Sequence, residues 1–387
     1  MTYYFDHNAS TPLSDEVLAC LSRVLKECYG NPSSVHTAGQ AARQTVEHAR
    51  GQVARLLHAE PREIVFTSGG TESDNLALFG VLRRDEGPAG KHVITTAIEH
   101  PAVLRACAQL ECEGATVTRL PVGRAGVVDA EEVRRALRPD TALISVMHAN
   151  NETGAAQPLE AIAAMAREAG VPLHSDGVQA AGRLPVDVRA LGVDLYSLSG
   201  HKLSAPKGVG VLWIREGVRL QALQFGGRHE RERRPGTENV PGIAALGSAA
   251  AWLLEHREAE ARRVAGLRDR LEGEIGRNIP GTRVNAGDAP RTPNTTNIQF
   301  DGLDGEALLI ALDLAGFQVS TGAACSSGAV EASHVLTAMG LSVAEARSSI
   351  RFSLGRTNDE AQVDALVEAV KTAVGRLRRS VPAHAHA

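Results

Sequence analysis

Lys202 is the first residue of this sequence whose position suggests chemistry. It follows the mostly apolar run 194–198, which is typical of a buried strand, and it ends a Ser-Gly-His-Lys turn at residues 199–202. Lysine is seldom buried, because burial disfavours its charged form. A lysine whose pKa is lowered in this way is a nucleophile that can form a Schiff base with a carbonyl cofactor. For this stretch taken alone, a surface lysine in a turn is the simpler interpretation.

Cys325 is the second candidate for chemistry. It lies within a run of small residues, 320–328, and not on an apolar helix stripe. A flexible and exposed setting is what a reactive thiolate needs, although a free cysteine in a loop would look the same. The other cysteines are Cys20, Cys28, Cys107 and Cys112. The spacing of the five cysteines matches neither a disulfide framework nor a zinc-binding motif. This usage predicts a reducing, cytoplasmic location.

Further polar residues follow predicted strands. Residues 67–73, Thr-Ser-Gly-Gly-Thr-Glu-Ser, lead from a strand into a helix, where backbone N–H groups bind anions; an ordinary helix cap is the alternative. His100 could stack on an aromatic ligand or carry protons, or it could be a solvated loop residue. Asp176 needs a cationic partner, such as a protonated pyridine nitrogen or a structural arginine. Arg351 could bind a carboxylate through two hydrogen bonds, or it could form a surface ion pair.

The elements that would position these residues follow an alternating pattern. Short runs rich in β-branched residues are separated by amphipathic helical stretches, and the runs are 64–67, 92–96, 116–120, 143–147, 171–175, 195–199 and 209–213. This alternation predicts an α/β fold with a mainly parallel, seven-stranded sheet. Ligands bind such sheets at the carboxyl ends of the strands, where the candidate residues lie.

A second, smaller unit is predicted in the C-terminal part. Apolar positions at helical spacing indicate a long helix over about residues 243–275. New strand signals follow at 296–300, 317–320 and 349–353, with helices between them and at 359–377. We therefore expect a large domain of residues 16–255 and a smaller α+β domain of residues 1–15 and 256–387, which carries the Cys325 loop.

Composition excludes several classes of protein. The chain has 387 residues, and its formal net charge of −4 makes direct nucleic-acid binding unexpected. No apolar run approaches the ~20 residues that span a bilayer, and the N-terminus lacks the features of a signal peptide. The cysteines and histidines do not form a metal-binding pattern, so no metal is expected.

Taken in order, the motifs resemble those of the cysteine desulfurases of the NifS/IscS type, within the class V aminotransferase group of pyridoxal phosphate enzymes. The segments that carry the resemblance span nearly the whole chain: 6–12, 30–36, 66–73, 99–100, 150–154, 174–179, 199–202, 234–239, 320–336 and 349–351. The long loop from Cys325 to Leu336 is similar to the NifS/IscS branch. In Gly-Gly-Arg-His-Glu, residues 226–230, His229 stands where glutamine is usual. The implied fold is fold type I of the pyridoxal phosphate enzymes.

The resemblance implies a role for each candidate. Lys202 would hold the cofactor and move the Cα proton, Cys325 would be the nucleophile, and His100 would stack on the cofactor ring and help to move protons. Asp176 would pair with the ring nitrogen and Gln179 would contact the phenolic oxygen. The residues expected at the phosphate are Gly70, Thr71, Ser199 and His201, with Thr237 from the other subunit of a homodimer. The residues expected at the substrate are Asn8, Asn151 and Arg351, and Asn151 would also contact the cofactor.

The implied activity is the conversion of L-cysteine to L-alanine. The sulfur would pass to Cys325 as a persulfide and then to an acceptor or scaffold protein for iron–sulfur clusters, another thio-cofactor or thiolated RNA. Selenocysteine lyase, or another class V lyase or aminotransferase, is the alternative enzyme, but a transaminase needs no nucleophilic thiol. An inactive sulfur-relay scaffold is a third possibility, against which the intact set of Lys202, Asp176, His100 and Arg351 argues. The sequence does not identify the acceptor.

Overall fold

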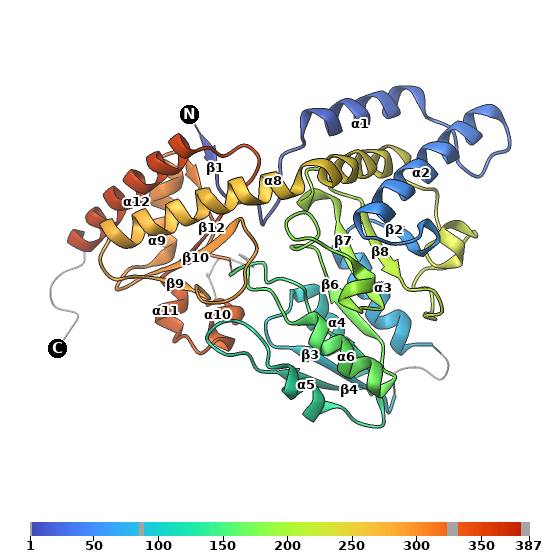
Figure 1. The fold of residues 1–387 in the computed structure, drawn as a ribbon, viewed down its shortest axis with the longest axis horizontal. Coiled ribbons are helices and arrows are strands. Elements are labelled where there is room, and N and C mark those ends of the chain that lie inside the picture. Colours follow the sequence, from blue (N-terminus) through green and yellow to red (C-terminus); the bar gives the residue numbers. More distant parts are fainter. Residues whose placement is uncertain (1, 85–88, 323–331, 381–387) are drawn as a thin grey trace.

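The computed structural model describes residues 2–84, 89–322 and 332–380 (Figure 1). Its largest sheet has seven strands in the order β2-β8-β7-β6-β5-β3-β4. The strands are β2 (Ile64–Thr67), β3 (His92–Thr96), β4 (Thr116–Leu120), β5 (Thr141–Ser145), β6 (Leu173–Asp176), β7 (Leu195–Ser199) and β8 (Gly210–Ile214). Strand β8 runs antiparallel to both of its neighbours, β2 and β7, and the other pairings in this sheet are parallel. The predicted mainly parallel α/β sheet is thus confirmed.

Helices cover both faces of this sheet because successive residues of each strand point to opposite sides. On one face, Val65 and Leu195 belong to a core shared with α3 (Gly70–Leu82) and α4 (Pro101–Cys112). On the other face, Phe66 and Tyr196 belong to a second core. The helices of that core are α1 (Asp15–Glu27), α2 (Thr37–Leu56), α5 (Ala130–Ala136), α6 (Leu159–Ala169), α7 (Val188–Leu191) and the first half of α8.

A smaller antiparallel sheet forms the other half of the molecule (Figure 1). Its order is β12-β10-β9, with β9 (Thr282–Asn285), β10 (Thr295–Phe300) and β12 (Ser349–Ser353). The N-terminal strand β1 (Tyr3–Tyr4) pairs in parallel with β11 (Phe317–Gln318), so the start of the chain joins this half. The helices here are α9 (Gly305–Leu314), α10 (His334–Ala338), α11 (Val343–Arg347) and α12 (Glu360–Ser380).

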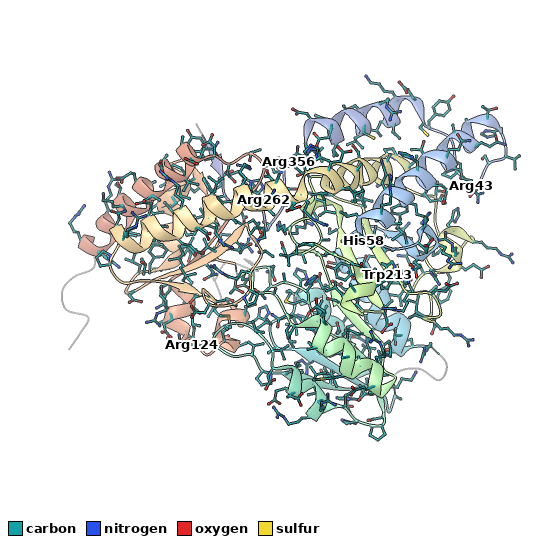
Figure 2. The ribbon with its side chains drawn as sticks, viewed as in Figure 1. Arg43, His58, Arg124, Trp213, Arg262 and Arg356 are labelled. Carbon is teal, nitrogen blue, oxygen red and sulfur yellow. The ribbon has the colours of Figure 1, made fainter. Side chains whose placement is uncertain are left out.

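The long helix α8 (Val240–Asn278) runs along both halves (Figure 1). It begins three residues earlier than the periodicity predicts, because Asn239 caps it by accepting a hydrogen bond from the N–H of Gly242 at 3.1 Å. Arg356, which follows β12, is labelled in Figure 2. It stacks over the ring of Trp252 on α8 and pairs with Glu16 of α1. The halves are thus joined by side chains as well as by α8. The division at residues 15/16 and 255/256 stays a prediction.

None of the helices in the described part of the chain has the length and apolar character needed to cross a membrane.

Candidate active site

A cavity of about 930 Å³ opens where β3, β5, β6 and β7 end. Its walls bring together residues that are far apart in the sequence: Asn8, Gly70, Thr71, His100, Asn151, Asp176, Gln179, Ser199, His201, Lys202 and Arg351. These are the predicted site residues, apart from two. Thr237 is exposed and does not line this cavity. Cys325 lies outside the described residues, although Gly322 and Ala332, on either side of the gap, both line the cavity.

Lys202 reaches the cavity from the short 3₁₀ turn that ends β7 (Gly200–Lys202). Its Nζ donates hydrogen bonds to the backbone carbonyls of Asn8 and Ala9, the latter at 2.8 Å. Burial, together with the nearby charges of Arg183 and Arg351, lowers the pKa of Lys202 to about 7. A substantial fraction of this amine is therefore uncharged near neutral pH, which makes it available as a nucleophile or base.

Two carboxylates and an imidazole meet at the bottom of the cavity. Oxygens of Asp74 and Asp176 and a ring nitrogen of His100 all lie within 4.8 Å of one another. Burial raises the pKa of both aspartates, and the charge of Asp176 raises that of Asp74 further. Asp74 Oδ1 is buried without a hydrogen-bond partner among the described residues. Carboxyl groups buried so close together can ionise only when a cation lies beside them, such as a protonated ring nitrogen.

His100 is held in place by the start of α4. Its ring is the N-cap of that helix and accepts a hydrogen bond from the N–H of Ala102 at 3.1 Å. Burial lowers the pKa of His100, so the neutral imidazole is favoured. This leaves a neutral ring that lines the cavity next to Asp176.

The start of α3, which also lines this cavity, suits an anion. The backbone of Gly70 and Thr71 begins α3, where the N–H groups have no partner within the helix. A Cβ on Gly70 would lie 2.7 Å from Cγ2 of Val178, so only glycine fits there. Ser199 lies next to Gly70, and His201 lines the same cavity. Burial lowers the pKa of His201 to about 4.

Asn8 connects the two halves of the molecule around the site. Its side-chain Nδ2 donates to the carbonyl of Asn151 at 3.0 Å and to Oγ1 of Thr295 at 2.9 Å. Its backbone carbonyl accepts hydrogen bonds from Lys202 and from Nε2 of Gln179. Both amide hydrogens of the Asn8 side chain are thus engaged within the protein, and its role in substrate binding stays a prediction.

Arg351 points into the cavity from β12. Its Nη2 donates to Oδ1 of Asp6 at 2.6 Å, and its Nη1 donates to the carbonyl of Asn151 at 3.0 Å. Its Nε is buried and has no acceptor in the described part of the chain. Of its five N–H donors, two are engaged by these contacts, and a guanidinium with donors to spare at a cavity is suited to an incoming carboxylate.

Several residues of the site were not predicted from the sequence. Arg183 donates a hydrogen bond of 2.6 Å to Oε1 of Gln179, four residues earlier, and this spacing was the available signal. Glu152 accepts a hydrogen bond of 2.5 Å from the hydroxyl of Ser333. His229, at the position where glutamine is usual, lies outside this cavity, and its Nε2 is 3.2 Å from Oγ of Ser33.

The whole arrangement suits a planar ligand of a particular kind. Its ring would carry a protonated nitrogen near Asp176 and an anionic group near Gly70. A carbonyl carbon would lie within reach of Lys202, and a carboxylate-bearing substrate would face Arg351.

Comparisons with known proteins agree with these features. The aminotransferase class-V family matches residues 3–366. A cysteine desulfurase of Trichormus azollae is 47% identical over 379 residues, which cover 98% of this chain and 94% of that protein. The cysteine desulfurase IscS of Methanosarcina thermophila is 46% identical over 382 residues, and NifS of Azotobacter vinelandii is 44% identical over 380 residues. These matches cover 98% of this chain and 93% and 94% of the two relatives.

Solved structures are also similar. A NifS-like protein superposes with a TM-score of 0.91 at 37% identity, covering 97% of this chain and 100% of its own. A NifS-like protein from Rickettsia africae gives a TM-score of 0.86 at 32% identity, with 97% and 100% coverage.

Proposed function

Because the chain belongs to the aminotransferase class-V family and is a pyridoxal phosphate-dependent cysteine desulfurase, we propose which of its residues carry the conversion of L-cysteine to L-alanine. When bound, pyridoxal phosphate supplies an electron sink that makes the Cα proton of L-cysteine acidic and its carbon–sulfur bond labile. The protein must hold the cofactor, orient the substrate, move protons and accept the sulfur.

The cofactor site is built from residues whose chemistry matches the parts of pyridoxal phosphate. Lys202 would bind the aldehyde carbon, and Asp176 would pair with the ring nitrogen, giving the buried carboxylates their cation. His100 would lie against the ring, and Gln179 would donate to the phenolic oxygen. The phosphate would bind at the start of α3, with the residues Gly70, Thr71, Ser199 and His201, while Asn151 would contact both cofactor and substrate.

Lys202 is also the proposed base. Since its pKa is lowered to about 7, it can accept the Cα proton of the substrate at neutral pH and return a proton later. Arg351, with Asn151 and Asn8, would bind the substrate carboxylate and so direct the Cα–H bond towards the amine. His100 would carry protons between the ring side of the site and the leaving sulfur.

Cys325 is the proposed sulfur acceptor. Its thiolate would attack the sulfur of the bound L-cysteine, so that an S–S bond forms while the C–S bond breaks. The electron pair of the broken bond returns to carbon, which gains a proton to give the methyl group of L-alanine, and Cys325 is left as a persulfide. The cavity-lining positions of Gly322 and Ala332 support this assignment, because the chain enters and leaves the 323–331 segment at the site.

The remaining assignments concern partners. Thr237 is exposed on a loop outside the cavity of its own chain, which supports a role at the phosphate of a second copy in a homodimer. The persulfide would be passed to an acceptor or scaffold protein for iron–sulfur clusters or other thio-compounds. Cytoplasmic residence is proposed from the free cysteines at positions 20, 28, 107 and 112.

The observation that carries the proposal is that Lys202, Asp176, His100 and Arg351 line one cavity. The test is the release of alanine from L-cysteine with excess reductant by the wild type, Lys202→Ala and Cys325→Ala proteins. We expect alanine and sulfide from the wild type, no cofactor absorbance band with Lys202→Ala, and a yellow but inactive Cys325→Ala. Equal alanine release by Cys325→Ala would instead support a selenocysteine lyase or β-lyase.

A further inference from the structure

Arg183 is a cation that lies next to the active-site cavity, where it contacts Gln179 of the cavity wall. Its Nη1 donates to the backbone carbonyl and to Oε1 of Gln179, at 2.8 and 2.6 Å, and its Nη2 donates to the carbonyl of His7 at 3.3 Å. Within residues 2–84, 89–322 and 332–380, no carboxylate forms an ion pair with it. Burial, followed by the charge of Arg351, lowers the pKa of Arg183 to about 10. Desolvated arginines are usually paired with an acid, so this one calls for a reason.

One consequence of Arg183 is the orientation of Gln179. The two ends of a glutamine amide differ only in whether they donate or accept, and the side chain can rotate to exchange them. Because Arg183 can only donate, it fixes Oε1 on its own side. The Nε2 group of Gln179 is thereby turned the other way, where it donates to the carbonyl of Asn8 at 3.1 Å. The second hydrogen of Nε2 is then left for an acceptor in the cavity.

A second consequence concerns Lys202. Gln179 and Lys202 donate to the same carbonyl, that of Asn8, so Arg183 is linked to the amine through two hydrogen-bonded residues. Arg183 and Lys202 also line a common small cavity of about 80 Å³ on the side of Lys202 that faces α8. The charged and titratable groups around the amine are Arg183, Arg351, Asp6, Asp176, His100 and His201.

The balance of these charges singles out Arg183. Arg351 is neutralised by its ion pair with Asp6. Asp176 favours the charged amine and would be neutralised by a protonated ring nitrogen of the cofactor. His100 and His201 are uncharged near neutral pH, since burial lowers their pKa. Arg183 is therefore the cation in this set whose charge remains uncompensated by a neighbouring carboxylate.

We propose that Arg183 is a positioning residue of the cofactor site: it fixes the amide of Gln179 towards the cofactor, and its charge favours the uncharged form of the Lys202 amine. This inference rests on the proposed roles of Lys202 and Gln179 and adds a residue that acts through both. It assigns the two effects to different properties of Arg183, its charge and its hydrogen-bond donors, which can be separated by substitution.

The electrostatic part is tested with three variants of the full-length protein, Arg183→Lys, Arg183→Gln and Arg183→Met. After removal of the cofactor, the rate at which added pyridoxal phosphate is captured is followed by absorbance between pH 5.5 and 9.5. Reduction with borohydride and peptide mass analysis then show that Lys202, and not Lys26, Lys91, Lys207 or Lys371, carries the cofactor. The capture rate plotted against pH has a midpoint that reports the pKa of the Lys202 amine. We expect Arg183→Lys, which keeps the charge, to have the wild-type midpoint. We expect both neutral variants to shift this midpoint upward by roughly one pH unit.

The orientational part is tested on the holoenzyme spectrum. Arg183→Met should move the absorbance band of the bound cofactor, because Gln179 can then rotate away from the phenolic oxygen. In a Gln179→Ala background, the same Arg183→Met change should leave the band where Gln179→Ala alone puts it. A purely structural role for Arg183 would produce the shift in both backgrounds.

The outcomes separate this inference from the proposed function. If the wild type lacks the absorbance band of the bound cofactor, or if Lys202→Ala keeps this band, the proposed function is wrong. Two results would overturn the electrostatic role of Arg183 once those controls behave as expected. In one, the neutral variants keep the wild-type midpoint of the capture rate against pH. In the other, Arg183→Lys shifts this midpoint as far as the neutral variants do. Arg167→Met, an exposed arginine on α6, is the matched control for loss of an arginine and should change neither readout. Two neutral variants are used so that misfolding of one leaves the other to decide.

Discussion

Arg351 donates a hydrogen bond of 2.6 Å to the carboxylate of Asp6, so a strand near the C-terminus and the N-terminal segment meet in the active site. The backbone of Asp6 also bridges to Ser353 on the same strand. This pair fixes one side of the guanidinium, while Nε remains buried and without an acceptor in the described residues. The guanidinium is thus held in a fixed direction before any substrate arrives, which limits the side-chain entropy lost on binding.

Arg351→Lys should weaken the binding of L-cysteine. Lysine keeps the charge but cannot hold both Asp6 and a substrate carboxylate with a planar fork of donors. We expect KM to rise on the order of tenfold to a hundredfold with a smaller change in kcat, because the contact is made in the ground state and in the transition state alike. Initial rates of alanine formation measure this. Arg347→Lys, an exposed arginine on α11, is the control, and an unchanged KM in Arg351→Lys would remove Arg351 from the substrate site.

Gly177, directly after Asp176, should not tolerate a side chain. A Cβ at this position would lie 2.0 Å from Cζ of Tyr196, whose ring is fully buried and whose hydroxyl is hydrogen-bonded to Nδ1 of His148 at 2.8 Å. Tyr196 cannot move without breaking that bond, so we expect Gly177→Ala to lower the free energy of unfolding by roughly 3 kcal/mol.

The matched control is Gly51→Ala in α2, where nothing lies within 4 Å of the added Cβ. There the change should raise the free energy of unfolding by about 0.5–1 kcal/mol, since alanine is the better helix former. Urea unfolding of both variants tests the pair. Equal effects of the two substitutions would contradict the steric argument.

The sequence is sufficient to predict those features of the fold and the site that depend on local patterns. Buried strands were visible as β-branched runs, and Asp176 and Lys202 could be placed at the site because each follows such a run. The strand predicted at 143–147 begins earlier, at Thr141, in the structure. Thr141 looks like a loop residue by composition, but its hydroxyl pairs with Nδ1 of His92 at 2.9 Å, which makes its burial possible.

The features that the sequence did not predict depend on contacts between distant segments. The pairing of Asp6 with Arg351 spans 345 residues, and no local pattern signals it. Arg183 resembles any other arginine after a glycine until the positions of Gln179, Asn8 and Lys202 are known together. Its role depends on the absence of a neighbouring carboxylate among the described residues, which only a three-dimensional arrangement can reveal.

Glu230 should be essential for the loop that carries Thr237. It accepts two hydrogen bonds from Arg50, at 2.7 and 2.9 Å, and one from the N–H of Phe66 on β2 at 2.8 Å. Glu230, Arg231 and Glu232 all have positive φ angles, a conformation that non-glycine residues adopt only when their surroundings impose it.

Glu230→Gln would leave the buried Arg50 with only the half-exposed Glu47, 3.2 Å from its Nε, as a counterion. We therefore expect a loss of roughly 3 kcal/mol in the free energy of unfolding. Glu232→Gln in the same loop removes an ion pair with Arg228 that is exposed on both sides, and it should cost less than about 1 kcal/mol. Denaturant unfolding compares the two, and similar losses would mean that the buried pair does not anchor the loop.

Glu99 should give the stability of the protein a pH dependence that a single substitution removes. Its side chain is buried, and Oε1 accepts hydrogen bonds from Thr96 and from the N–H of Met147 at 2.7 and 3.0 Å. Oε2 has no partner in the described part of the structure. Burial raises the pKa of Glu99 from 4.5 to about 8, so the folded protein holds a proton that the unfolded chain releases above pH 4.5.

The sign of the effect follows from this difference in bound protons. The stabilising contribution is fully present below pH 4.5 and is lost as the pH rises through about 8, because the unfolded chain binds fewer protons over that interval. Glu99→Gln keeps the acceptor for Thr96 and Met147 but cannot ionise. We therefore compare the free energies of unfolding of the wild type and of Glu99→Gln at each pH. The wild-type value minus the Glu99→Gln value should fall by on the order of 4 kcal/mol between pH 4.5 and 8.5. Urea unfolding at each pH with saturating cofactor measures this difference, and a flat difference would show that Glu99 is already ionised in the folded protein near neutral pH.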